Sequence, residues 1–294
     1  MNEESPKVLW HYTNLNGMMG ILGTQTLRAS DISLLNDGEE YSLGIDFIKS
    51  YLSSNFLHDY FPEQEGNEKY KKYIEEIIWQ LDRMLYPRDL AYGKYVVSLS
   101  GARDQLSQWR GYGNNGYAIG FKYKELKRDV ENIPELNNRA KGDIFELNKV
   151  YYVGSSSDLR NVKKFNKLFD SIARMMREEK DADIFTHNQD LYHYLPIYSP
   201  YVKHEGFEEE DEYRILVGSN RPPAGYSPTK FGPRAYVDVG FSRKSIYKVA
   251  IAPGDNRDVR LFAAQRFLQG NGYTDALGTV SYTHLRAHET VLDL

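Results

Sequence analysis

Apolar residues recur along this chain with two periods, one typical of strands and one typical of helices. Short apolar or alternating runs predict strands at 8–12, 27–30, 94–100, 116–123, 147–153, 212–217, 235–239 and 247–251. Apolar residues spaced three and four apart predict helices at 15–22, 36–51, 70–85, 159–176 and 259–268. We expect loops at 57–68 and 222–234, and a turn or two of helix within 105–115.

This mixture of elements favours a single α+β domain, with helices packed around a mixed or antiparallel sheet. The 294 residues are enough to bury a hydrophobic core. No repeat and no long linker divides the chain. We predict one domain over residues 1–279.

Composition narrows the function classes. The 37 basic and 41 acidic residues give a net charge of -4, which argues against non-specific binding of nucleic acid. The absence of cysteine excludes a disulfide framework, a thiolate metal site and a cysteine nucleophile. The chain starts without a signal-peptide pattern and has no stretch of ~18 apolar residues. We expect a cytoplasmic protein without a membrane partner.

The first predicted strand ends in Trp10, His11, Tyr12 and Thr13, directly before a predicted helix. A strand end beside a helix N-terminus is a place where ligands approach, because unpaired N–H groups converge there. These residues are therefore candidates for a binding site. The alternative is that His11 is an ordinary core histidine with its hydrogen bonds satisfied.

A second candidate lies where the predicted strand at 94–100 ends. Alternation along a strand places Ser98 and Ser100 on the same face. Trp109, Arg110 and Tyr112 then place two large rings and a guanidinium within one turn, which suits a stacking wall. The alternative for Trp109 is that it fills the core.

The acidic run from Glu208 to Glu212 enters a predicted strand that continues through Arg214. On that strand Glu210, Glu212 and Arg214 share one face. Neighbouring carboxylates raise each other's pKa while an arginine opposes this, so one acid can stay charged and the other protonated. A charged carboxylate suits stabilisation of an oxocarbenium-like sugar. The alternative is a solvated acidic face.

Neither a P-loop, nor G-x-G-x-x-G, nor H-E-x-x-H, nor the G-x-S-x-G elbow of a serine hydrolase is present. We expect no metal. The motifs resemble instead a bacterial family known as domain of unknown function 2971. The matching segments are LWHYTNLNGMMGIL, TLRASDISLLNDGEEY, VVSLSGARDQLSQWRGYGNNGYAIGF, KVYYV, KHEGFEEEDEYRIL and VAIAPG, in this order over most of residues 8–270.

The order of a histidine strand, a serine and aromatic motif and a glutamate strand is similar to the ADP-ribosyltransferase fold, which holds NAD in a cleft of a split sheet. The resemblance implies roles on the matching positions. His11 would hold the adenosine-side ribose and Thr13 the nicotinamide end, and Tyr12 is a further NAD-binding position. Ser98 and Ser100 would brace the site, and Glu212, beside Glu210, would orient the ribose 2′-hydroxyl. Either Tyr112 or Trp109 would stack on nicotinamide, and Arg28 and Arg214 would contact phosphate.

The resemblance implies an enzyme that transfers ADP-ribose from NAD to a nucleophile on protein or nucleic acid. The alternative is a nucleotide-sensing or protein-binding module that keeps the cleft without the chemistry. A nuclease or phosphotransferase acting on RNA ranks last, because the chain lacks a basic stripe. The macromolecular acceptor and the oligomeric state stay open.

The C-terminal segment carries His284, His288 and Glu289, which look like a metal-binding or catalytic corner. Val280 to Thr290, however, is what a transposase-based sequencing adapter encodes in one reading frame, residue for residue. We therefore expect residues 280–294 to be a non-native tail and leave these three residues out of any site.

Overall fold

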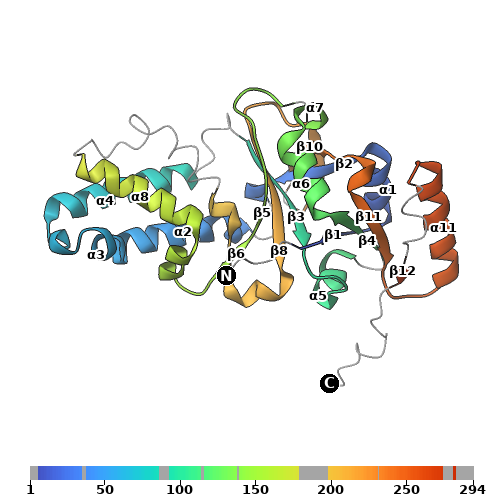
Figure 1. Ribbon diagram of the computed structural model, residues 1–294, viewed down its shortest axis with the longest axis horizontal. Helices are drawn as coiled ribbons and strands as arrows, with labels where there is room; N and C mark the ends of the chain where they lie inside the picture. The colour runs from blue at the N-terminus through green and yellow to red at the C-terminus, as the bar shows by residue number, and fades with distance from the viewer. Residues whose placement is uncertain are drawn as a thin grey trace, which may run out of the picture.

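The computed structural model describes residues 6–34, 38–85, 93–113, 116–137, 139–178, 198–230, 232–273 and 281–282. Within them a curled, mainly antiparallel sheet lies among helices, which confirms the α+β class (Figure 1). Its strands are β1 (Val8–Thr13), β2 (Thr26–Asp31), β3 (Gly93–Ser100), β4 (Tyr117–Lys122), β5 (Ile144–Lys149), β8 (Glu212–Ser219), β9 (Gly225–Thr229), β10 (Gly232–Gly240), β11 (Ile246–Ile251) and β12 (Ser281–Tyr282). A second, two-stranded sheet joins β6 (Tyr151–Val153) to β7 (Val202–His204) in parallel.

The helices form two groups. A helical lobe, on the left in Figure 1, consists of α2 (Gly38–Ser54), α3 (Phe56–Tyr60), α4 (Glu68–Leu85) and α8 (Lys163–Arg177). The other long helices are α1 (Leu15–Thr24), α6 (Tyr123–Asn132) and α11 (Arg257–Gly270), and they pack with the sheet. The short helices are α5 (Leu106–Gln108) and α7 (Pro134–Asn137), with a π-helical turn over Trp109–Gly113. The 3₁₀ turns are η1 (Ile32–Leu34), η2 (Pro62–Gln64), η4 (Ser156–Asn161), η5 (Ser199–Tyr201), η6 (Glu205–Glu210) and η7 (Arg243–Ser245).

The central strands β3 and β8 pair along their whole length and separate two hydrophobic cores. Odd-numbered residues such as Val97 and Ile215 pack with α1, α6 and α11, whereas Val96 and Leu216 face the helical lobe. Because strand side chains alternate between the two faces, the polar even-numbered residues of both strands are also on the side of the helical lobe.

The sheet divides at β3. One edge of β3 pairs with β1 at a single position, Trp10 opposite Ser100, and with β2 at two positions, Ser30 opposite Val96 and Asp31 opposite Tyr95. From there β1 leads to β4 and β11, while β2 leads to β10 and β9. The two arms leave the same edge of β3 in different places, so the sheet divides there.

The longer predicted helices are present at 15–24, 38–54, 68–85, 163–177 and 257–270. The prediction of a loop over 57–68 was wrong, because α3 and η2 form there. Phe56, fully buried in the core of the helical lobe, fixes the start of α3. The single strand expected at 147–153 is two strands, β5 and β6, that break at Val150 and belong to different sheets.

The elements that the sequence analysis missed include α6 and β9. The helix α6 buries only Leu126, Asp129 and Val130 among charged residues, so its apolar pattern is too sparse to detect. Within the expected loop at 222–234, β9 pairs with β10, with Pro228 opposite Pro233. Proline is tolerated there because β9 lies at the sheet edge, where ladder donors are not required.

Several expectations concern residues outside the described part of the chain. The first two residues of the helix predicted over 36–51 lie outside it, and so do His284, His288 and Glu289. Of the C-terminal segment, Ser281 and Tyr282 pair in parallel with Ala250 and Ile251. None of the described helices combines the length and the apolar character needed to cross a membrane.

Candidate functional site

A cleft of about 280 Å³ opens where the sheet divides, and we call it the sheet cleft. It is lined from β1, β2, β3 and β8, together with residues from the segments beside them. The lining contains every site residue predicted from the sequence except Thr13 and Trp109. These lining residues are His11, Tyr12, Arg28, Ser98, Ser100, Tyr112, Glu210, Glu212 and Arg214.

The floor of the sheet cleft is a buried ion-pair network. Register places Ser98 opposite Arg214 and Ser100 opposite Glu212. The Arg214 guanidinium donates from Nε to Glu212 Oε1 at 2.7 Å and from Nη2 to Oε2 at 2.9 Å. Lys203 Nζ lies 3.3 Å from Glu212 Oε2 and 2.6 Å from Glu210 Oε2. Lys203, Glu212 and Arg214 have side chains no more than 6% exposed, so the network is shielded from solvent.

This network determines the charge of Glu212. Burial acts to raise the pKa of this carboxyl group, but Arg214, Lys203 and a hydrogen bond from Ser98 outweigh burial and lower the pKa to about 2. Glu212 is therefore ionised at neutral pH. It can stabilise positive charge on a ligand but cannot act as a general acid.

The predicted placement of Glu210 on the same strand as Glu212 was wrong. Glu210 ends η6, and Asp211 has a left-handed backbone with φ of 41°, so strand alternation does not extend back to Glu210. Glu210 reaches the cleft by another route, because Ser100 Oγ donates to its carbonyl oxygen at 2.8 Å and Lys203 holds its carboxylate. Its side chain is 18% exposed, more than that of Glu212.

His11 lines the cleft from β1. Its Nδ1 lies 3.1 Å from the Ser98 carbonyl oxygen, which can only accept a hydrogen bond. Burial lowers the pKa of His11, and the bond to Ser98 opposes this only in part. The ring is therefore neutral at neutral pH, with the proton on Nδ1 and an acceptor at Nε2.

The aromatic residues divide into a buried pair and an exposed ring. Trp109 is buried, meets Tyr12 edge to face at 4.8 Å, and donates from Nε1 to Asp104 at 3.0 Å. Tyr112, on the π-helical turn, lines the cleft and is 59% exposed. Of the two stacking candidates, Tyr112 lines the sheet cleft, whereas Trp109 packs against Tyr12 and is not part of the lining.

Thr13 lies outside the sheet cleft. Its hydroxyl occupies the space beside Gly17, where a Cβ atom would lie only 1.9 Å from the Thr13 oxygen. The predicted contact of Thr13 with the nicotinamide end is therefore not supported by its position.

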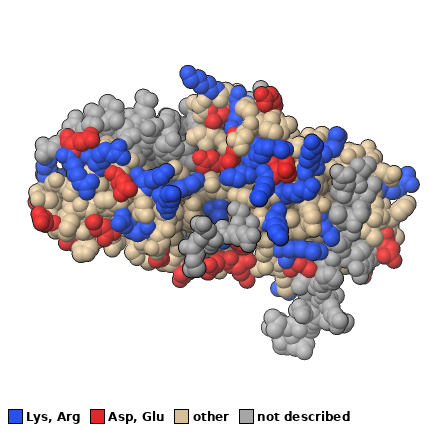
Figure 2. Space-filling view, in the orientation of Figure 1, with Lys and Arg blue, Asp and Glu red and all other residues tan. Residues whose placement is uncertain are grey.

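Four cations line the cleft: Arg28, Lys203, Arg214 and Arg234. Sequence reasoning missed Lys203 and Arg234. Lys203 lies just before the acidic run and Arg234 within the expected loop, and neither position carries a periodic pattern. Basic side chains are also visible in and around a hollow near the middle of the molecule (Figure 2).

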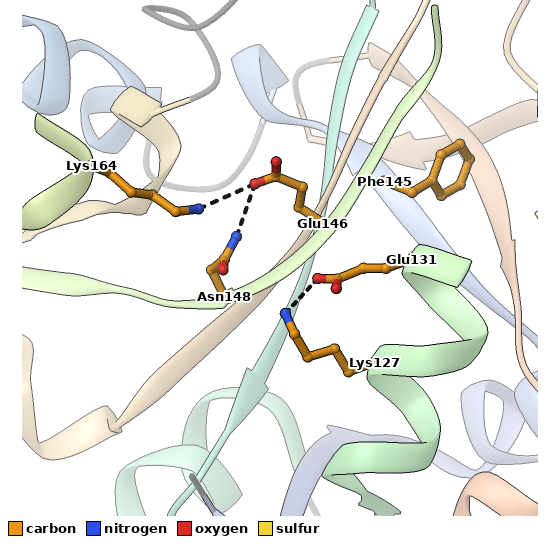
Figure 3. A pocket seen from close by; sticks show the side chains of 6 residues that line it. All are labelled: Lys127, Glu131, Phe145, Glu146, Asn148 and Lys164. Carbon is orange, nitrogen blue, oxygen red and sulfur yellow. Dashed lines mark hydrogen bonds and ion pairs between the residues drawn. The ribbon is translucent and has the colours of Figure 1, made fainter. Parts of the chain in front are cut away.

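A second pocket of about 360 Å³ lies along β5, and we call it the β5 groove (Figure 3). Lys127 pairs with Glu131, and Lys164 pairs with Glu146 at 3.2 Å. These four side chains are 23% to 34% exposed. Lys127 also donates to the Leu147 carbonyl oxygen, and Leu147 N donates to Glu131. The groove therefore supplies hydrogen-bond partners for the backbone N–H and C=O of Leu147 in β5.

In the described segments, no three His, Asp or Glu side chains gather as metal ligands would. A comparison with curated proteins and one with solved structures each returned no match. A comparison with family models matched residues 108–215, which include Tyr112 and the Lys203, Glu210, Glu212 and Arg214 network. The model is that of a family described as "Protein of unknown function (DUF2971)", and this match supports the assignment of the chain to that family.

Proposed function

We propose that the sheet cleft binds NAD and transfers its ADP-ribose group to a nucleophile, with release of nicotinamide. The observation that carries the proposal is the buried, ionised carboxylate of Glu212 on the floor of a cleft at the split of the sheet. Stabilisation of developing positive charge by a preorganised group in a water-poor site is the kind of contribution that lowers a barrier most.

The cleft offers the groups that a nicotinamide ribose requires. The carboxylates of Glu210 and Glu212 accept hydrogen bonds from ribose hydroxyls, and His11 offers a neutral acceptor at Nε2. The exposed ring of Tyr112 offers a face on which a planar base stacks. These residues come from β1, η6, β8 and the π-helical turn, so the ligand would be held from several sides.

In the proposed step, the bond between C1′ of the ribose and the nicotinamide nitrogen breaks. Its electron pair leaves with neutral nicotinamide, and C1′ takes on oxocarbenium character. The nucleophile then forms a bond to C1′ and loses its proton. Glu212 stays ionised throughout and stabilises the cation, while Glu210, the more exposed carboxylate, accepts the proton of the nucleophile.

Glu212 already accepts hydrogen bonds from four donors: two nitrogens of Arg214, Lys203 Nζ and Ser98. A carboxylate has about four acceptor positions, so a ribose hydroxyl must replace one donor. Lys203 Nζ lies 3.3 Å from the carboxylate, farther than either Arg214 nitrogen at 2.7 and 2.9 Å. Lys203 lies closer to Glu210, at 2.6 Å, and keeps that partner when the hydroxyl takes its place.

The test is to incubate the full chain with NAD labelled in the adenylate part and to follow nicotinamide release and labelled protein or nucleic acid. Wild-type protein is expected to release nicotinamide, and Glu212→Gln is expected to lose this activity while keeping its fold by circular dichroism. Failure of intact wild-type protein to release nicotinamide, with water or with a broad set of protein and nucleic-acid acceptors, would overturn the proposal.

A nucleotide-sensing module is the second candidate, and the fully occupied Glu212 carboxylate favours it. A buried ion pair with all acceptor positions taken can serve to hold the two strands and the cleft in shape. In that case, calorimetry would show NAD or ADP-ribose binding to both wild type and Glu212→Gln, and neither protein would release nicotinamide.

A further inference from the structure

Two arginines line the sheet cleft from the β2 and β10 arm. Asp238 of β10 lies opposite Arg28 in the strand register, yet the Arg28 guanidinium lies 4.5 Å over the ring of Tyr236 instead. Among the described residues Arg28 forms no ion pair. The N–H donors of its guanidinium group are therefore available to a ligand in the cleft.

Arg234 is two residues before Tyr236 on β10, and alternation places both on the same face. Its Nε is buried and has no hydrogen-bond partner in the described part of the chain. An unsatisfied buried donor costs about 1–3 kcal/mol, so a buried guanidinium nitrogen at a cleft wall indicates an acceptor that the ligand supplies.

The charges of the cleft point to the nature of that acceptor. Among the described residues, the lining has four cations, Arg28, Lys203, Arg214 and Arg234, and two carboxylates, Glu210 and Glu212, so 4 - 2 leaves a surplus of two positive charges. Lys203 and Arg214 are paired with the carboxylates. The surplus therefore lies on Arg28 and Arg234, and it is equal in magnitude and opposite in sign to the charge of an ionised diphosphate diester.

We propose that Arg28 and Arg234 form a subsite for the diphosphate of a dinucleotide, at the β2 and β10 side of the sheet cleft. Guanidinium groups match phosphate oxygens with two parallel hydrogen bonds. Ser30, on the same face of β2 as Arg28, adds a hydroxyl donor to the wall. That the diphosphate belongs to NAD rests on the proposed function; that an organic diphosphate binds here does not.

This subsite replaces the phosphate contact expected for Arg214. Arg214 is 1% exposed, holds both oxygens of Glu212 and donates from Nη1 to the Pro200 carbonyl oxygen at 2.6 Å. Its guanidinium is committed to the floor of the cleft. Arg28 and Arg234 lie on the β2 and β10 arm, whereas Arg214 lies on the central strand β8. A dinucleotide bound to both these arginines and Glu212 would therefore extend from β8 to the β2 and β10 arm.

The test is calorimetry of NAD, ADP-ribose, inorganic pyrophosphate and nicotinamide riboside with the full chain. The variants are Arg28→Gln and Arg234→Gln, and the matched control is Arg243→Gln, since Arg243 also lies over a tyrosine ring, that of Tyr273, but outside the cleft. Each cleft variant is expected to weaken ADP-ribose binding ~10-fold or more, as for a lost charge-assisted hydrogen bond. Nicotinamide riboside binding and the control are expected to stay unchanged.

Undiminished ADP-ribose binding by both cleft variants would overturn the subsite, even if nicotinamide release continues. Wild-type binding of ADP-ribose and pyrophosphate that both variants lose, without any nicotinamide release, would support the subsite and count against the transferase. A variant that fails to fold is replaced by the corresponding Lys substitution. This keeps the charge but not the fork, and an intermediate loss of ADP-ribose affinity is expected.

Discussion

The sheet cleft and the β5 groove contain similar residues and behave differently. Among the described residues, each is lined by two glutamates together with lysine, polar uncharged and aromatic side chains. In the cleft, Lys203, Glu212 and Arg214 are at most 6% exposed, whereas the four charged side chains of the groove are 23% to 34% exposed. The cleft also has two arginines beyond those that its carboxylates neutralise.

Burial and unbalanced charge, rather than residue composition, distinguish the sheet cleft from the β5 groove. Charges in the groove balance each other, remain in contact with water and supply partners for the backbone N–H and C=O of Leu147. Charges in the cleft fix the ionisation of one carboxylate, and two of its arginines, Arg28 and Arg234, exceed the number that its carboxylates neutralise. An exposed pair contributes little to stability, while breaking a buried one is costly.

The largest expected contrast concerns catalysis. Glu212→Gln keeps the size of the side chain but removes the negative charge, and it is expected to lower the rate of nicotinamide release by ~100-fold or more. Glu146→Gln, the matched change in the β5 groove, is expected to leave the rate unchanged. Chromatographic assay of nicotinamide from both variants makes the comparison. Equal rates would remove the reason to place chemistry in the cleft.

The next contrast concerns stability. Arg214→Met removes the bidentate partner of buried Glu212 and is expected to lower the free energy of unfolding by ~3–5 kcal/mol. Lys164→Met breaks the exposed pair with Glu146 and is expected to cost no more than ~1 kcal/mol. Urea unfolding at neutral pH measures both. A cost for Lys164→Met as large as that for Arg214→Met would show that burial does not separate the two regions.

The third contrast is the pH dependence of that stability. The pKa of Glu212 falls from 4.5 to about 2 on folding, so its contribution is complete above pH 4.5 and is lost as pH falls toward 2. Between pH 6 and pH 3, wild type should therefore lose on the order of 1–2 kcal/mol more than Glu212→Gln. Urea titrations of both proteins at the two pH values test this. Parallel losses would mean that Glu212 is not held ionised by its neighbours.

The smallest contrast compares two exposed tyrosines. Tyr112→Ala is expected to weaken NAD binding about 5-fold through loss of a stacking surface. Tyr226→Ala alters a ring of similar exposure, 64% against 59%, that does not line the cleft, and no change in affinity is expected. Neither change should alter unfolding by more than ~0.5 kcal/mol. An equal loss of affinity in both would mean that stacking on Tyr112 is not specific.

Most of the cleft was predictable because its residues lie on strands with a clear period of two. Ser98 and Ser100 share a face for that reason, and so do Glu212 and Arg214. A period of two along one strand does not predict which strand pairs with it. The register that places Ser98 opposite Arg214 and Ser100 opposite Glu212 is therefore visible only in the structure. Glu210 was misplaced because the backbone turns at Asp211, which no neighbouring residue indicates.

Residues missed by the sequence analysis share a physical cause. Lys203 and Arg234 are single cations whose importance depends on what lies opposite them in space. The strand β9 was hidden by Pro228, which is compatible with pairing only because β9 is at an edge. The spacing of Trp109 and Tyr112 in the sequence suits either residue for stacking. Only the structure shows that Trp109 is buried and Tyr112 exposed.

A crystal structure of the full chain with NAD or ADP-ribose tests most directly whether the sheet cleft binds a dinucleotide. We expect density in the sheet cleft, with a ribose hydroxyl at Glu212 and the diphosphate between Arg28 and Arg234. A dinucleotide bound in the β5 groove, or an empty sheet cleft in crystals soaked at saturating ligand, would contradict it.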